Sequence, residues 1–576
     1  MKKTLSLILV LAMLMSLLAA CGGTAASTAE TASAPAASTE ETAQEEPAAE
    51  EAPTEEEATP AEGSAAEEPV TEGEGCTNVV EYPIAEEGTT LSIFWMFHNF
   101  LSMFNITQDV INDIPTFAAA EEATGIKLDF RLSGEEIYSE QIKLLWASGD
   151  YCDLLVNGEQ NYASGVDAAV EEEVLLDLVP YLEEHAPDYL RIMEKHPSFR
   201  TDLTSAEGYI VSFSEYCEYV DGGVAIRKDW LDQVGMEVPS TMDEVTEVAR
   251  AFKEQLGIRN PIMWNSDLSS CCVWNGYGVT APSSMGSDIG WQIDSDGLTV
   301  VPSIKLEGTK KALQWMHDAF AEGLCTDDFM NVMNIAFDEY VYANETGIVS
   351  TNANLLADGG AERSGQPDYD LRAIPDPVEE EGMDNPLGKT SGGIGASAIA
   401  VSALSEVPEL AIEYMNWLYT EEGILVSNYG VEGEAFEYVD GKPAYTDLVL
   451  ANPDGMPAFV ATFRYTSLVG TPYYNTTERK IASFTSEAEK ECFDIWITGH
   501  TGESIYQGKM TVDESEEYNS LATDIATAVA EQTLLFVTGE RSLDEYDEFV
   551  ADMEGMGLPR MIELKQAAYD RYLENQ

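Results

Sequence analysis

Residues 91–156 alternate between strand-like and helix-like patterns, and this alternation restricts the possible folds more than any other feature. The apolar runs at 91–95, 126–131 and 152–156 predict strands, and the stretches at 115–124 and 137–147 predict helices. Consecutive parallel strands need a crossover connection, which is usually a helix. The order strand, helix, strand, helix, strand therefore predicts an α/β fold with a largely parallel sheet.

The sequence after residue 220 predicts a second α/β unit, which opens at 223–231. Two helix starts there have capping-box spacing, Thr241 with Glu244 and Ser542 with Glu545, and an apolar stripe follows each pair. Further elements are predicted as helices at 308–320 and 405–420, a strand at 347–354 that runs into a polar loop, and a crossover strand at 392–402.

The N-terminus has the pattern of an export signal. Two lysines precede an apolar run from Leu5 to Leu18, which is shorter than the roughly 20 residues that span a bilayer. Small residues at positions 19 and 20 suit a signal peptidase, and Cys21 follows directly. We therefore predict that residues 1–20 are a signal peptide. Cys21 could be a lipid attachment site, as discussed next, or a chance cysteine after an ordinary secretory signal.

The motif Leu18-Ala19-Ala20-Cys21 resembles the lipobox of bacterial lipoproteins. The resemblance implies that the Cys21 thiol is lipidated, with palmitate among the fatty acids, and that the protein is lipid-anchored on the extracellular face of the cell membrane. No later apolar run is long enough to span a bilayer, so the lipid would be the only anchor. Residues 21–78 follow as a predicted disordered acidic linker, because residues 22–78 hold 15 glutamates and no Lys or Arg.

Charge and cysteine usage limit the partners. A formal net charge of −75 repels nucleic acids, so no nucleic-acid partner is expected. If Cys21 is lipidated, seven of the eight cysteines remain, so at least one is unpaired, and their spacings match no zinc pattern. We therefore predict mostly free, buried thiols and no metal site.

The sequence carries no catalytic motif. None of its five histidines is paired at metal-ligand spacing, and HExxH, GxSxG and P-loop motifs do not occur. The glycine-rich run 391–395 has no lysine, which argues against a phosphate cradle. We predict a protein that is not an enzyme and needs no cofactor. The sequence does not exclude the carboxylate pair of a glycoside hydrolase, because 104 acidic residues supply pairs at any separation.

Several aromatic side chains lie in loop-like, polar-flanked segments. Sugar rings present apolar C–H faces that pack on aromatic rings, and a ligand cleft needs mostly apolar walls with a few placed polar groups. At least two of these aromatics are predicted to line a cleft, with structural packing as the alternative for each: Trp95, Trp264, Trp274, Tyr277 and Trp291.

Short stretches across about residues 88–574 keep the order found in one protein family. They are ASGD at 147–150 with CD at 152–153, IRKDWL at 226–231, PST at 239–241, AFK at 251–253, NYGVEG at 428–433, FVTGE at 536–540, the segment 544–557, and AAYDRY at 567–572. By this set the chain resembles the extracellular solute-binding proteins (family 1) of carbohydrate ABC importers, of the large lipoprotein type.

The resemblance implies a two-lobe periplasmic-binding-protein-like fold (type II), with discontinuous lobes joined by a multi-segment hinge. Lobe one would comprise 79–213 plus 400–458, and lobe two 216–392 plus 463–576. The segments that cross between the lobes would lie near 212–216, 394–400 and 459–465. Several relatives carry a calcium loop after the AFK helix, but residues 253–262 lack the alternating acids that calcium requires, so no calcium is expected there.

Candidate ligand-binding residues follow from strand ends and crossings, because α/β sheets bind ligands at the carboxyl ends of their strands. Arg227 opens the second lobe and offers a forked donor pair, with a structural salt bridge as the alternative. The full predicted set is Trp95, Phe97, Asn157, Glu159, Tyr216, Arg227, Trp264, Trp274, Tyr277, Asn352, Asn354, Glu432 and Tyr465.

The resemblance implies a monomer that captures an oligosaccharide between its lobes and delivers it to ABC permease subunits in the membrane. One alternative is an importer protein for a peptide or other non-sugar solute. A more remote alternative is a surface glycoside hydrolase or lyase.

The anchor gives the first testable prediction. Replacing Cys21 with Ala should release the protein to the culture medium with its ligand binding intact, because the lipid is the only expected attachment. Fractionation and immunoblotting of cells that express each form measure the release. A Cys21→Ala variant that stayed with the membrane would contradict the anchor.

Overall fold

The structure is a computed structural model, and it describes residues 76–219, 222–266, 268, 273–283, 288–332, 337–383, 393–497 and 508–574. These residues belong to one compact unit, residues 72–576. The predicted signal peptide, Cys21 and the acidic linker up to residue 75 lie outside the described residues.

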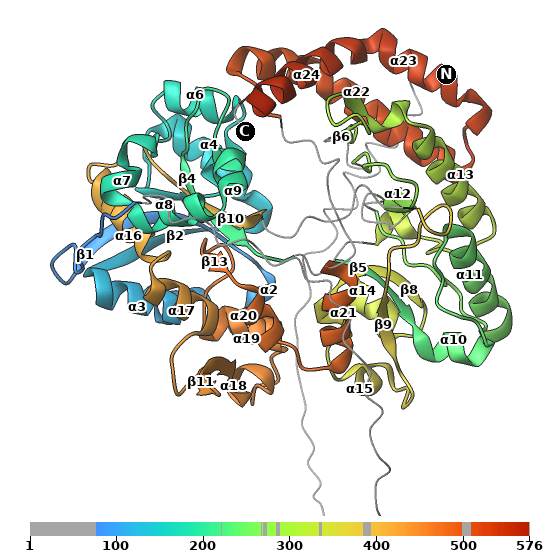
Figure 1. Ribbon diagram of the computed structural model, residues 1–576, viewed down its shortest axis with the longest axis horizontal. Helices are drawn as coiled ribbons and strands as arrows, with labels where there is room; N and C mark the ends of the chain where they lie inside the picture. The colour runs from blue at the N-terminus through green and yellow to red at the C-terminus, as the bar shows by residue number, and fades with distance from the viewer. Residues whose placement is uncertain are drawn as a thin grey trace, which may run out of the picture. The chain divides into compact units, whose positions relative to one another are not determined.

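The first half of the fold is built on a six-stranded sheet with the order β13-β4-β10-β3-β1-β2 (Figure 1). Its strands are β1 (Thr89–Phe97), β2 (Ile126–Gly134), β3 (Leu154–Val156), β4 (Ser212–Cys217), β10 (Gly393–Val401) and β13 (Tyr474–Asn475). Strand β1 pairs in parallel with β2 and β3, so the prediction from strand–helix alternation is confirmed. Strand β10 lies antiparallel between β3 and β4, and β13 runs parallel to β4 at the edge.

Helices cover both faces of this sheet because successive side chains of a strand point to opposite faces. Leu91, Ile93 and Trp95 join one core cluster with α3, α8 and α16, whereas Phe94 packs on α4 in another. The helices of this half are α2 (Phe100–Met103), α3 (Pro115–Thr124), α4 (Tyr138–Ser148), α5 (Gly158–Asn161), α6 (Gly165–Glu171), α7 (Leu182–His185), α8 (Pro187–Lys195), α9 (Pro197–Leu203), α16 (Pro408–Trp417), α17 (Glu421–Tyr429), α18 (Asp447–Leu450), α19 (Ala458–Tyr465) and α20 (Thr477–Ala482), beside the hairpin β11 (Phe436–Val439) and β12 (Lys442–Tyr445).

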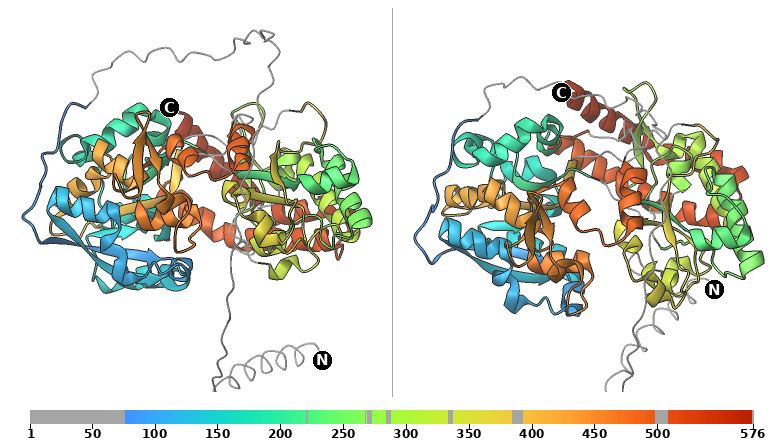
Figure 2. Two further views of the ribbon diagram at one scale, coloured as in Figure 1. Left: turned by 90° about the horizontal axis from the view of Figure 1, so that it is seen from below. Right: turned by 60° about the horizontal axis from the view of Figure 1, so that its bottom comes forward.

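The second half holds a three-stranded sheet with the order β8-β5-β9, in which both pairings are antiparallel. The long C-terminal helix α22 packs against α13, and α24 packs against β7. Figure 2 shows the blue and orange segments of the first half and the green and yellow segments of the second half from two further sides. The strands are β5 (Gly222–Arg227), β6 (Trp291–Ile293), β7 (Val300–Pro302), β8 (Ile348–Asn352) and β9 (Leu371–Ile374). The helices are α10 (Lys228–Val234), α11 (Met242–Leu256), α12 (Val273–Gly276), α13 (Glu307–Ala321), α14 (Phe337–Tyr342), α15 (Gly360–Ser364), α21 (Glu487–Ile497), α22 (Val512–Thr538), α23 (Tyr546–Met556) and α24 (Leu558–Glu574).

One of the two predicted capping boxes is present. The backbone N–H of Glu244 donates to Thr241 Oγ1 at 3.3 Å, and Glu244 Oε2 accepts from the N–H of Thr241 at 3.1 Å. The prediction at Ser542 and Glu545 is wrong. Ser542 accepts from the N–H of Asp544 instead, because a 3₁₀ turn, η9 (Leu543–Glu545), precedes α23 and brings the nearer amide to the hydroxyl.

Two of the predicted crossing segments are strands of the first sheet, β4 and β10, as the sequence indicates. The third prediction, at residues 459–465, is wrong. These residues form α19, with Val460 and Ala461 buried on one face, and β13 still pairs with β4 afterwards. The chain reaches α21 of the second half only after α20, so the crossing lies near residues 483–486. The remaining lobe limits stay a prediction.

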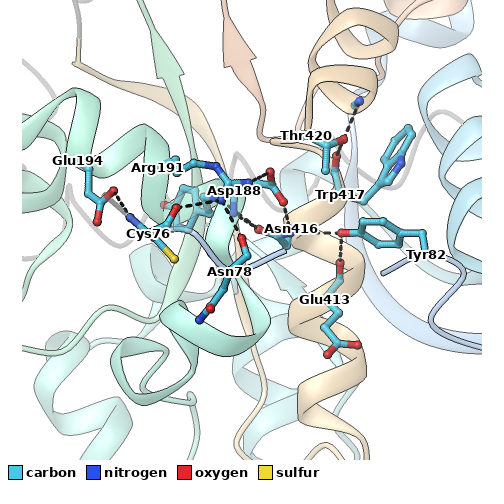
Figure 3. Close-up of polar contacts among 12 residues, drawn as sticks. Cys76, Asn78, Tyr82, Asp188, Arg191, Glu194, Glu413, Asn416, Trp417 and Thr420 are labelled. Carbon is cyan, nitrogen blue, oxygen red and sulfur yellow. Dashed lines mark hydrogen bonds and ion pairs between the residues drawn. The ribbon is translucent and has the colours of Figure 1, made fainter. Parts of the chain in front are cut away.

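Residues 76–82 tie the end of the acidic linker to the first half of the fold (Figure 3). Arg191 Nη1 donates to the carbonyl of Asn78 at 3.0 Å, and the N–H of Cys76 donates to Glu194 Oε2 at 3.1 Å. Buried Asn416 donates from Nδ2 to Asp188 Oδ2 at 2.7 Å and to the Tyr82 hydroxyl at 3.2 Å. Among the described residues, contacts with helices α8 and α16 are therefore made from Cys76 onward, which includes the last three residues of the predicted linker.

The described cysteines agree with the prediction of mostly free, buried thiols. Cys152, Cys325 and Cys492 are buried, and Cys76, Cys152 and Cys325 are free thiols; Cys271 and Cys272 lie outside the described residues. Within the described ranges, no helix is long and apolar enough to cross a membrane.

Candidate functional site

A small polar cavity of about 230 Å³ lies where the first sheet meets α19, α20 and the start of η8 (Ala353–Leu356). Its wall includes Glu215 from β4 and Ser397 from β10, and α20 contributes Arg479 and Lys480. The remaining lining residues are Asn354, Ala396, Phe459, Thr462, Phe463, Ser467, Leu468, Val469, Gly470, Thr471, Tyr473, Asn475 and Ser483. Polar and charged residues form the larger part of the lining, and Phe459, Phe463 and Tyr473 add aromatic surface, so the cavity offers both hydrogen-bonding groups and apolar contact.

An irregular stretch of β10 shapes one wall of this cavity. The pairing register with β4 shifts between Ile394 and Ala398, as in a β-bulge. A Cβ atom on Gly395 would lie 2.5 Å from the Glu215 carboxylate, which real Cβ atoms do not tolerate. Glycine at 395 therefore leaves the space that the Glu215 side chain occupies.

Glu215 is held by protein donors rather than by a cation. Asn475 Nδ2 donates to Glu215 Oε1 at 2.9 Å, and Ser397 also hydrogen-bonds to the carboxylate. Burial raises the pKa of Glu215, and the Asn475 hydrogen bond and the charge of Arg479 act in the opposite direction. The Glu215 carboxylate in the cavity wall is therefore already hydrogen-bonded to Asn475 and Ser397.

Arg479 places a buried guanidinium in the lining. Only 9% of the residue is exposed, and its Nε atom has no hydrogen-bond partner. The side chain also hydrogen-bonds to the Tyr445 hydroxyl, and the backbone N–H of Arg479 is bound by Thr476 Oγ1, the N-cap of α20. The fold therefore fixes the start of the helix and leaves one strong donor of Arg479 unused.

The loop between α19 and β13 adds two hydroxyl groups without partners, Ser467 Oγ and Thr471 Oγ1. The loop is fixed at its start by Thr116, whose N–H and hydroxyl both donate to the Thr466 carbonyl, at 3.2 and 2.9 Å. Gly470 has a φ of +98°, and a Cβ there would lie 3.1 Å from the Trp95 ring. Buried polar atoms are normally satisfied, so three lining residues that each hold a buried, unpartnered polar atom make this wall a candidate place for a hydrogen-bonding ligand.

Two predicted site residues lie at this cavity. Asn354 lines it and accepts from Lys480 Nζ at 3.4 Å. Trp95 is fully buried against Phe117 and Phe130 and supports the cavity from beneath Gly470. Its role is therefore to support the wall, while direct ligand contact stays a prediction.

Tyr216 lies beside the cavity lining in sequence but faces the other way. Its ring stacks on His196 at 4.1 Å and on Tyr474 at 5.4 Å, away from the side on which Glu215 points. Alternation along β4 explains the difference, because adjacent residues of a strand point to opposite faces. The crossing was located correctly, but the residue that faces the cavity is Glu215.

The other predicted aromatic residues belong to core clusters. Trp264, Trp274 and Trp291 are buried in the second half, and Trp274 Nε1 donates to the Leu268 carbonyl at 2.8 Å. Phe97 is buried in the first half, and Tyr277 packs half-buried against the second-half core. Structural packing, the alternative considered for the loop tryptophans, is what the structure shows for these three.

Arg227 has the structural role that the sequence left open. It is fully buried, and its Nε and Nη2 donate to the Asp229 carboxylate, each at 2.8 Å. Nη1 donates to Asn344 Oδ1 at 2.8 Å, and the guanidinium stacks on Trp230 and Tyr369. Its donors are therefore engaged within the protein.

The remaining predicted residues are spread over the fold. Asn157 exchanges hydrogen bonds with the backbone of Ala398, and Asn352 caps η8 by accepting from the N–H of Asn354. Glu432 is exposed, and Tyr465 packs half-buried in the cluster of the β11–β12 hairpin. No group of three or more His, Cys, Asp or Glu residues that could hold a metal ion occurs in the part of the chain that the structure describes.

Sequence reasoning missed Glu215, Ser467, Thr471, Asn475 and Arg479. No local signal marks them, since adjacent cations like those at 479 and 480 also occur at 2–3, 227–228 and 310–311. The cavity itself was not readable, because it joins segments more than 200 residues apart.

The chain matches the family model of bacterial extracellular solute-binding proteins over residues 107–424. This match covers more than half of the chain, so the protein belongs to that family, as the resemblance predicted. Its fold is the two-lobe periplasmic-binding-protein-like α/β fold.

Individual relatives are distant. Lipoprotein LipO of Bacillus subtilis is 22% identical over 348 residues, which is 57% of this chain and 65% of that protein. The fructooligosaccharide ABC transporter substrate-binding protein FusA of Streptococcus pneumoniae is 28% identical over 144 residues, 23% of this chain and 26% of FusA. The matches thus span less than two thirds of these curated relatives. Among solved structures, the alginate-binding protein AlgQ2 without calcium ion superposes with a TM-score of 0.68 at 19% identity, over 85% of this chain and all of that one.

The unpartnered hydroxyls of Ser467 and Thr471 predict that their removal does not destabilise the ligand-free protein. Ser467→Ala and Thr471→Val should leave the free energy of unfolding of the ligand-free protein unchanged or raise it by about 1 kcal/mol, because each removes a buried polar group that makes no hydrogen bond. Chemical denaturation measures the change. A loss of more than about 1 kcal/mol would mean that the hydroxyls are needed for folding.

The buried carboxyl group of Glu159 predicts that the free energy of unfolding depends on pH. Burial raises its pKa from 4.5 to about 7, and its Oε2 atom has no partner. The folded protein then keeps a proton that the unfolded chain loses, so the free energy of unfolding contributed by this group falls as pH rises from about 4.5 to about 7 and stays constant above. The free energy of unfolding of the wild type should change between pH 5 and pH 7.5 by about 2 kcal/mol more than that of Glu159→Gln, as measured by chemical denaturation at each pH. Exposed Glu171→Gln serves as the control, and an unchanged slope in Glu159→Gln would contradict the assignment.

Proposed function

We propose that the protein is the substrate-binding lipoprotein of an ABC importer, which captures an oligosaccharide and delivers it to permease subunits in the membrane. The observation that carries the proposal is the cavity with three buried, unpartnered polar atoms, Arg479 Nε, Ser467 Oγ and Thr471 Oγ1. A fold gains nothing from such atoms, whereas a ligand rich in hydroxyl groups satisfies them. Signal peptide cleavage, lipid attachment at Cys21 and a location on the outer face of the cell membrane are parts of the same proposal.

The position of the cavity supports capture by closure. Glu215, Ser397 and Asn475 belong to strands of the first sheet, whereas Asn354 follows β8 of the second sheet. A ligand that bonds to Asn354 and to the first-sheet residues together stabilises the arrangement in which the two lobes meet. Hinge closure around a ligand is the motion that two-lobe binding proteins use.

The aromatic walls and the relatives support a sugar as the ligand. Phe459 and Phe463 line the cavity and offer apolar ring surface to C–H faces. FusA is named for fructooligosaccharides and AlgQ2 for alginate, both of which are sugar polymers. Binding without bond cleavage is proposed as the whole activity.

Ligand-induced stabilisation of the purified mature protein tests the proposal. A panel of oligosaccharides should contain members that raise the melting temperature, since a ligand at a hundredfold excess over Kd adds about 2.7 kcal/mol to the free energy of unfolding. The same glycans should be recovered uncleaved. A panel in which peptides raise the melting temperature and no glycan does would overturn the sugar assignment, and release of product would overturn the binding role.

Three matched variants locate the binding. Ser467→Ala and Thr471→Val should weaken the best glycan by about tenfold, the value of one lost hydrogen bond. Ser427→Ala is the control, because the Ser427 hydroxyl is also buried and unpartnered but lies outside the cavity lining. Equal effects of all three variants on affinity would place the binding site elsewhere.

A further inference from the structure

Three cationic side chains are buried among the residues that the structure describes, namely Arg227, Arg479 and Lys480. Two of the three meet in the wall of the same 230 Å³ cavity. The whole chain has only 29 basic residues against 104 acidic ones, so this gathering is opposite in sign to the rest of the molecule.

Arg227 and Arg479 differ in what surrounds the guanidinium. Arg227 has the Asp229 carboxylate at 2.8 Å on two of its nitrogens. Arg479 forms no ion pair within the described part of the chain, and its Nε is unpartnered. The Glu215 carboxylate interacts with the charge of Arg479 but forms no ion pair with it, so the buried guanidinium of the ligand-free protein is only partly compensated, which is unfavourable.

Glu215 does not supply the missing partner of Arg479 Nε. Its oxygens accept from Asn475 and Ser397, and no ion pair joins it to Arg479 within the described residues. Arg479 and Lys480 together with Glu215 give the charged part of the lining a formal net charge of +1. No protein group in the described part of the chain supplies an acceptor for Arg479 Nε, so this position is open to an acceptor on a ligand.

We infer that the part of the ligand that enters this cavity carries a carboxylate, so that the ligand is an acidic oligosaccharide with a uronic acid or another carboxylate-bearing sugar. Arg479 is the residue that determines this specificity. The inference rests on the proposed function, since it names the class of sugar bound at the same site.

The chemistry favours a carboxylate over a neutral hydroxyl. A planar carboxylate accepts charge-assisted hydrogen bonds from a guanidinium and cancels its charge, and such bonds are about twice as strong as neutral ones. The hydroxyls of Ser467 and Thr471 supply two more donors from the loop that borders the cavity. A neutral sugar would satisfy the same donors but leave the buried positive charge only partly compensated.

Ligand pairs that differ only in charge test the inference without altering the protein. Oligogalacturonides, alginate oligomers and chondroitin oligomers are compared with their methyl esters by calorimetry, beside neutral fructan, glucan and galactan oligomers. The tightest ligand should be an acid, and esterification of its carboxylates should weaken binding at least tenfold.

A matched pair of variants then assigns the effect to Arg479. Arg479→Met should weaken the acidic ligand at least tenfold more than it weakens the methyl ester, because the acid loses a charge-assisted hydrogen bond and the ester loses only a neutral one. Arg259→Met is the control, because Arg259 is an exposed cation paired with Asp327 outside the cavity and should change neither affinity. Far-ultraviolet circular dichroism and the melting temperature check that each variant is folded.

Each outcome decides the matter. Equal affinity for acid and ester, or a neutral glycan as the tightest ligand, would overturn the inference and leave the sugar-binding function standing. An acid preference that persists in folded Arg479→Met would remove the role of Arg479 and overturn the inference at this site. No binding by any glycan would overturn the proposed function, and the inference with it.

Discussion

The antiparallel pairing of β4 with β10 is the interaction on which the rest of the structure depends. Strand β4 leads from the first half of the fold into the second, and β10 brings the chain back after about 180 residues. Because β10 pairs with β3 on its other side, the returning strand is joined by hydrogen bonds to the parallel strands formed before the chain left. The same pairing carries the irregular register at residues 394–398, and so positions Glu215 and Ser397 in one wall.

Buried polar groups in this molecule fall into two kinds. Asn416 and Arg227 have partners within the protein: Asn416 bonds to Asp188 and Tyr82, and Arg227 bonds to Asp229 and Asn344. Such groups fix one arrangement of the elements that they join. Ser467, Thr471 and Arg479 each retain an atom without a partner. A buried donor without an acceptor destabilises the fold, and these three residues also line the cavity, so a ligand there could supply the missing partners.

Local sequence was sufficient where short-range physics decides the outcome. The first sheet's β1, β2 and β3 follow from apolar runs separated by helices, and α3 has the bounds that the sequence predicted. The capping box at Thr241 follows from a three-residue spacing. The family resemblance placed a crossing at residues 459–465, but these residues form α19, with Val460 and Ala461 buried on one face of the helix.

The aromatic content of the sequence predicted a sugar cleft but did not show which side chains line a cavity. Trp264 and Trp274 look alike as loop tryptophans, yet both are buried in the core of the second half, because neighbouring helices cover them. Tyr216 and Glu215 are adjacent in sequence, and only the direction of the pleat in β4 decides which one faces the cavity.

The sequence by itself determined the class of fold and the family, and it predicted the export signal and the acidic linker, because each depends on short contiguous stretches. The tertiary structure alone decided the site. Glu215, Asn354, Ser467 and Arg479 come from four separate segments, and they share one cavity only because β10 and β13 both pair with β4. A buried arginine is a structural residue if the folded protein supplies its acceptors, as Asn344 does for Arg227, and it can bind a ligand if the protein supplies none, as at Arg479 Nε. The local sequence shows neither, because the acceptor can lie far away in the chain.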